Sequence, residues 1–65
     1  MSIIEQLNQI IIAKGLKQSF ISERTGWSKD KTSKTLRGER KMTAEELLIL
    51  CNILEVNPSE LQIPA

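Results

Sequence analysis

Histidine is absent from this 65-residue sequence, and cysteine occurs once, as Cys51. A disulfide within the chain is therefore excluded, and zinc is disfavoured, because one thiolate without further ligands cannot hold the ion. The sequence also has no glycine-rich phosphate loop and no serine with a plausible base beside it. We therefore expect no cofactor and no enzymatic activity.

Long apolar runs are missing as well. No stretch approaches the roughly 20 apolar residues of a membrane span, and the first residues lack the basic and apolar regions of a signal peptide. Together with the single cysteine, these absences favour a protein of the reducing cytoplasm with no membrane partner. A chain of this length forms one domain, residues 1–65, with a marginal core.

Aromatic residues are scarce, since only Phe20 and Trp27 occur, so a core must come from aliphatic side chains. No segment of four or more residues alternates with period two, which argues against a sheet. Helix signals are frequent instead. Ser2 and Glu5 fit a capping box ahead of an apolar stripe, Ile4, Leu7 and Ile11, and Ile12 falls outside this stripe. This pattern predicts a helix over residues 3–14 ended by Gly15.

Four further helical segments follow. We expect a helix from Gln18 to just before Gly26, and another over residues 28–37 with Ser28 as N-cap. A second capping box, Thr43 to Glu46, opens a helix whose buried stripe is Leu47, Leu50, Cys51 and Leu54. Asn57 and Pro58 then predict a final single turn. The expected fold is all-α with five short helices.

Positive charge is concentrated in one part of the chain. Residues 29–41 contain six bases and two acids, a local net of +4, whereas the rest has three bases and six acids, a net of −3. The whole-chain charge of +1 therefore hides an uneven distribution. A basic element on a near-neutral scaffold is typical of a protein that binds a polyanion.

The order of these helices, with Gln18, Ser22, Gly26, Ser28 and Gly38 at these spacings, resembles the lambda-repressor and Cro-like helix-turn-helix family. The resemblance covers nearly the whole chain and implies a helix-turn-helix at about residues 18–37. It makes residues 28–37 the recognition helix, which lies in the major groove of double-stranded DNA. It also places four side chains of that helix against base edges: Lys29, Asp30, Ser33 and Lys34.

The sequence departs from the family pattern at three positions. Lys17 stands where a serine or threonine N-cap is usual. Thr32 and Thr35 stand where larger apolar residues normally hold the recognition helix, so each hydroxyl needs a partner, such as a carbonyl one turn back.

Positions 29, 33 and 37 lie four apart, as do 30 and 34, so one face of the recognition helix is basic and polar. Such a face can hydrogen-bond bases in the major groove. Asp30 has two readings, a base contact or a favourable charge at the helix N-terminus. Trp27 is interpreted as a wedge between helices, and Cys51 as a core residue. Six other polar side chains are expected at the DNA backbone: Lys17, Gln18, Lys31, Arg37, Arg40 and Lys41.

These features predict a sequence-specific DNA-binding transcriptional regulator, of phage-type or bacterial repressor and Cro-like kind. One short helix reads few base pairs, so we expect a homodimer on a pseudo-palindromic operator. The tail, residues 61–65, is the first candidate for self-association. The alternative is a protein-interaction module on the same fold, such as an antitoxin-like or antirepressor-like subunit, with an apolar functional surface that includes Ile12 and Ile63.

Overall fold

The computed structural model describes residues 2–62, and over that range it contains helices and no strands. There are four α-helices and one short 3-10 helix: α1 (Ile3–Lys14), α2 (Gln18–Thr25), α3 (Lys29–Leu36), α4 (Ala44–Leu54) and η1 (Pro58–Glu60). The expected all-α fold is confirmed, and the fifth helix is a single turn as expected, of 3-10 type. A bilayer-spanning helix is not found among residues 2–62, where the longest helix, α1, has 12 residues.

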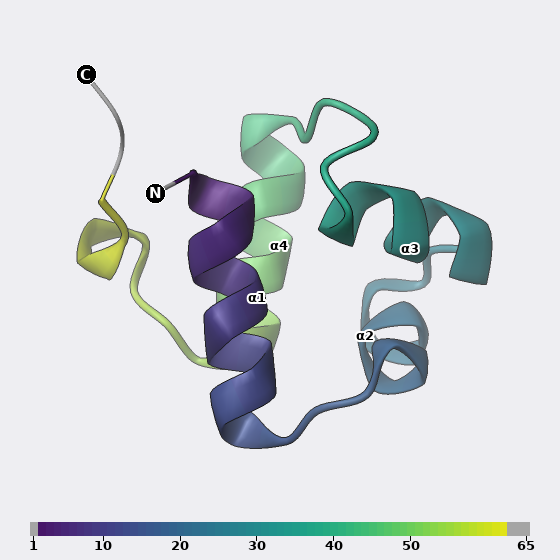
Figure 1. Ribbon diagram of the computed structural model, residues 1–65, viewed down its shortest axis with the longest axis horizontal. Coiled ribbons are helices and arrows are strands. Elements are labelled where there is room, and N and C mark those ends of the chain that lie inside the picture. The colour runs from purple at the N-terminus through teal and green to yellow at the C-terminus, as the bar shows by residue number, and fades with distance from the viewer. Residues whose placement is uncertain (1, 63–65) are drawn as a thin grey trace.

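The helices surround one core. In Figure 1, α2 and α3 lie on one side of α1 and α4, and η1 lies on the other. Eight apolar side chains from every α-helix and from the C-terminal segment are buried together: Leu7, Ile11, Ile21, Leu36, Leu50, Cys51, Leu54 and Leu61. Burial raises the pKa of the Cys51 thiol, in keeping with its predicted role as a core residue.

The predicted apolar stripes are largely confirmed. Leu7 and Ile11 of α1 are buried, whereas Ile12, which falls outside the stripe, is 78% exposed. On α4, Leu50 and Leu54 are buried and Leu47 is half-buried, so Leu47 lies at the margin of the stripe.

Side-chain caps begin three of the four α-helices, α1, α3 and α4. Oγ of Ser2 accepts from the amide of Glu5 (3.1 Å), and Thr43 and Glu46 form a complete capping box. Lys17 gives α2 no side-chain cap, as its departure from the family pattern implies. Glu55, the C-cap of α4, has a φ of 58°, a left-handed conformation that glycine adopts more easily.

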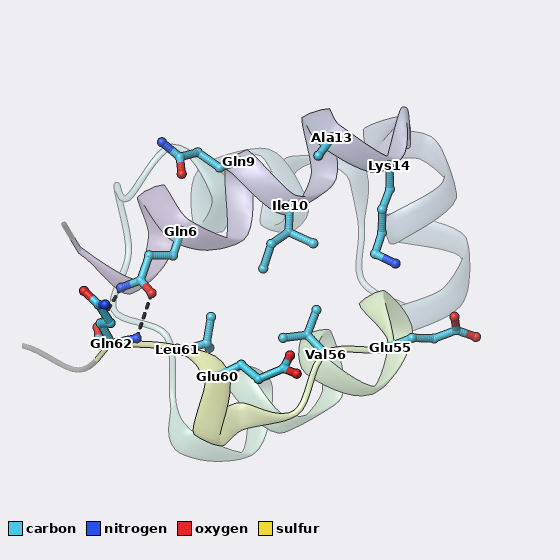
Figure 2. A pocket seen from close by; sticks show the side chains of 10 residues that line it. All are labelled: Gln6, Gln9, Ile10, Ala13, Lys14, Glu55, Val56, Glu60, Leu61 and Gln62. Atoms are coloured by element: carbon cyan, nitrogen blue, oxygen red, sulfur yellow. Dashed lines mark hydrogen bonds between the residues drawn. The ribbon is translucent and has the colours of Figure 1, made fainter.

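The C-terminal segment returns along α1. The side-chain amide of Gln6 donates to the carbonyl of Gln62 (2.6 Å) and accepts from its N–H (2.8 Å), as Figure 2 shows. An open groove of about 690 Å³ lies between this segment and α1. Ile10, Val56 and Leu61 line it together with polar side chains at its edges.

Candidate nucleic-acid interface

The corner between α2 and α3 is built around Gly26. Its φ of 79° lets the chain turn sharply after α2, and its amide donates to the carbonyl of Ser22 (3.0 Å). Oγ of Ser22 donates in turn to the carbonyl of Trp27 (2.7 Å), and the amide of Trp27 donates to Oγ1 of Thr25 (3.1 Å). These bonds tie the end of α2 to the residue before the N-cap of α3.

The inner face of α3 is largely polar. Thr32, Thr35 and Leu36 are its buried residues. Oγ1 of Thr32 donates to the carbonyl of Ser28 (2.9 Å), and Oγ1 of Thr35 donates to that of Lys31 (2.7 Å). Both hydroxyls therefore find the partner one turn back that the sequence predicted, and both residues are fully buried.

The outer face of α3 carries the expected base-contacting residues. Lys29, Asp30 and Lys34 are exposed and Ser33 is half-buried. Nζ of Lys34 lies 3.2 Å from Oδ2 of Asp30, so the acid and the base form an ion pair one turn apart. Asp30 also stands in the first turn of α3, where a carboxylate interacts favourably with the helix dipole.

The first turns of α2 and α3 meet at the surface. A hollow of about 180 Å³ is lined by Gln18 and Ser19 of α2 and by Lys29 and Thr32 of α3. The structure therefore brings Gln18, an expected backbone contact, next to Lys29, an expected base contact. Lys17 is exposed immediately before this turn. The N-terminus of α2 has no side-chain cap, and a positive side chain beside its free amides favours the binding of an anion.

The other expected backbone contacts differ in their surroundings. Arg37 is exposed and pairs with Glu39. Lys41 is exposed in the loop between α3 and α4, with no carboxylate in ion-pair range among residues 2–62. Lys31 and Arg40 instead turn towards α4, where both contact Glu46 at distances of 3.0 and 3.1 Å.

Glu46 is a residue of this region that sequence reasoning did not select. Its capping box with Thr43 was the available signal, but that motif indicates only a local helix start. In the structure Glu46 is buried, and its pKa is lowered from 4.5 to about 2. The amide of Thr43 contributes most, Lys31 and Arg40 also lower the pKa, and burial opposes them.

Trp27 connects these contacts to the helix corner. It is half-buried and packs against the core cluster, and Nζ of Lys31 lies 4.9 Å from the centre of its ring. The cation–π contact adds to the ion pair of Lys31 with Glu46. The side chain of Lys31 is thus held between α4 and the corner that precedes α3.

Comparison with known proteins identifies a family. The family model described as the Cro/C1-type HTH DNA-binding domain matches residues 6–64. No curated protein and no solved structure matches the chain. The match spans nearly the whole sequence, including the α2–Gly26–α3 unit with its charged outer face. This chain therefore belongs to the family of Cro/C1-type helix-turn-helix DNA-binding domains.

Proposed function

We propose that this protein is a sequence-specific transcriptional regulator of the phage-type or bacterial repressor kind, which acts on DNA in the cytoplasm and inserts α3 into the major groove. The observation that carries the proposal is that Gln18 and Lys29 line the same surface hollow. The start of α2 and the outer face of α3 therefore form one continuous surface. An α-helix fits the major groove of B-DNA, and polar side chains on its exposed face can reach base edges.

Within this proposal the two sets of residues act differently. Lys29, Asp30, Ser33 and Lys34 read bases, because they stand on the outer face of α3. Contacts to the DNA backbone position the domain without reading sequence. The exposed residues suited to that role flank the face: Lys17, Gln18, Arg37 and Lys41.

The ion pair of Asp30 with Lys34 gives the outer face a testable feature. The carboxylate holds Nζ of Lys34 at 3.2 Å and offers an acceptor to the amino group of cytosine or adenine. We expect Asp30→Asn to shift the preferred base at one operator position. Sequences selected by the two proteins from one random DNA pool measure this shift. Identical selected sequences would leave Asp30 with its role at the helix N-terminus alone.

Two copies on one operator are part of the proposal. The 8 residues of α3 contact only a few base pairs, so a second half-site, about 34 Å away, is needed for a long specific site. In the proposed tail, Leu61 is buried in the chain's own core and Gln62 is bound to Gln6, while Ile63 and the residues after it lie outside the described range. A dimer contact through the tail therefore involves residues from Gln62 onward.

Truncation after Gln62 tests the pairing, because it keeps the core residue and both bonds to Gln6. We expect the truncated chain to bind an operator with two half-sites much more weakly, and a single half-site with unchanged affinity. Footprinting of the full chain should show two protected major grooves about 10 base pairs apart. Unchanged operator binding after truncation would exclude residues 63–65 from the interface and leave Gln62, which the truncated chain keeps, and exposed Ile12 as the next candidates.

A salt titration on DNA of mixed sequence tests the function itself. Each neutralised phosphate releases counterions, so log K should fall linearly with log salt, with a slope of about −0.9 for each phosphate contact. The alternative, an antitoxin-like or antirepressor-like module that binds protein, predicts no such affinity. Absence of salt-dependent binding by the folded protein would reject the DNA-binding regulator in favour of that module.

A further inference from the structure

Polar contacts attach α3 to α4. The carboxylate of Glu46 accepts from the amide of Thr43 (3.0 Å) and from Nη1 of Arg40 (3.1 Å), and it lies 3.0 Å from Nζ of Lys31. One side chain of α4 therefore receives donors from the loop before it and from α3. The side chain of Glu46 is only 11% exposed, so water competes little for these bonds.

The contacts continue into the backbone of α3. Nη1 of Arg40 also donates to Oγ1 of Thr35 (3.0 Å), and that hydroxyl donates to the carbonyl of Lys31 (2.7 Å). Lys31 and Thr35 are one turn apart, so Glu46 holds the same face of α3 directly and through Arg40. Two points of attachment along one face restrict both rotation of the helix about its axis and tilt.

The side chains of Lys31 and Arg40 are committed by these contacts. Nζ of Lys31 lies against Glu46 and over the ring of Trp27, and the guanidinium of Arg40 lies between Glu46 and Thr35. Binding a phosphate would remove their charge from a buried carboxylate, and an unpaired buried charge is strongly unfavourable. Lys41 has no such partner among residues 2–62 and is exposed.

We propose that Glu46 is the positioning residue of the DNA interface, and that Lys31 and Arg40 support α3 internally and do not contact phosphates. The inference rests on the proposed function and deepens it. It assigns Lys31 and Arg40 a role different from the backbone contacts expected from their charge. It also makes the fidelity of base reading depend on a carboxylate that touches no DNA.

A matched pair of substitutions tests the role of Lys31. Lys31→Met and Lys41→Met each remove one positive charge and keep a long apolar side chain, which in the first case continues to cover Trp27. On random duplex DNA, Lys41→Met should make the slope of log K against log salt shallower by about 0.9 per protomer. Lys31→Met should leave the slope as in the wild type. Equal changes in the two variants would make Lys31 a phosphate contact and overturn the proposal.

Glu46→Gln tests the positioning role. The readout is the ratio of the affinities for a selected site and for random DNA, measured at a temperature where the protein is folded by circular dichroism. We expect the ratio to fall at least about tenfold, because a misplaced α3 loses base contacts that only the selected site offers. Affinity for random DNA should be retained or raised, because contacts to the DNA backbone do not depend on sequence. An unchanged ratio would overturn the proposal.

Leu61→Ala provides the control for lost stability. Leu61 is buried in the core cluster and lies at the groove beside α1, and it has no part in the polar contacts of Glu46. This variant should melt at a lower temperature and keep the wild-type affinity ratio when folded. If the affinity ratio falls in both variants, lower stability alone is enough to reduce it, and a specific role for Glu46 is rejected. A wild-type protein with no salt-dependent DNA binding would instead reject the proposed function.

Discussion

Protonation of Glu46 at acid pH should lower the folding stability of this domain. Its pKa is lowered from 4.5 to about 2, chiefly by the amide of Thr43, then by Lys31 and Arg40 against the opposing effect of burial. Because the folded-state pKa lies below the unfolded-state value, the folded protein holds fewer protons. The stabilisation is therefore fully present above about pH 4.5 and is lost as the pH falls towards 2.

The size of the effect follows from the same pKa values. At about 1.36 kcal/mol per pH unit, a fall from 4.5 to about 2 corresponds to an upper bound of roughly 3 kcal/mol. Screening by solvent reduces this value, because Lys31 is 38% exposed and Arg40 is 32% exposed. We expect about 1–2 kcal/mol, which is a large share of the stability of so small a domain.

Urea denaturation between pH 7 and pH 2 measures the effect. Wild type should lose about 1–2 kcal/mol more than Glu46→Gln over this range, because glutamine has no proton to gain. Glu45→Gln is the matched control: Glu45 is exposed in the same turn of α4, and its replacement leaves the contacts of Glu46 in place. Parallel curves for wild type and Glu46→Gln would refute the attribution of acid sensitivity to this carboxylate.

Three further substitutions test the local geometry by thermal or urea melts. Gly26→Ala should lower the free energy of unfolding by about 1 kcal/mol: the added Cβ meets nothing within 4 Å, so the whole cost comes from the φ of 79°. An unchanged melt would refute this. Glu55→Gly should stabilise by about 0.5–1 kcal/mol by relieving a φ of 58°, whereas Glu60→Gly, which relieves no such strain, should not stabilise. Ser28→Ala should cost about 1 kcal/mol because Oγ caps the amide of Lys31, and Ser28→Gly only a few tenths.

The fold was predictable because its signals are local. Ser28, Thr43 and Gly26 act within a few residues of their own positions, so a cap or a positive φ can be inferred from the residue type and the spacing. Helical periodicity likewise predicted the buried stripe of α1. The single 3-10 turn at the C-terminal end was expected from Asn57 and Pro58, and Oδ1 of Asn57 does accept from the amide of Ser59 (3.0 Å).

The polar contacts between helices were not predictable in the same way. Thr43 and Glu46 could be recognised as a capping box, but the same motif gives no indication that the carboxylate also accepts from Arg40. That bond depends on the path of the loop between α3 and α4. Lys31 contacts Glu46 from another helix, and the two residues are 15 positions apart in the sequence. Helical spacing relates only residues of one helix, so it cannot predict this contact. The roles of individual side chains at DNA stay predictions.

The ion pairs also change how the charge of this domain is interpreted. The local net of +4 over residues 29–41 counts six bases against two acids, but Glu46 lies outside that range and binds Lys31 and Arg40. Two other bases pair with the acids within the range, Lys34 with Asp30 and Arg37 with Glu39. Lys29 and Lys41 are left without a carboxylate partner among residues 2–62. The number of phosphates bound should therefore be smaller than the number of bases, and the salt slope measures that difference directly.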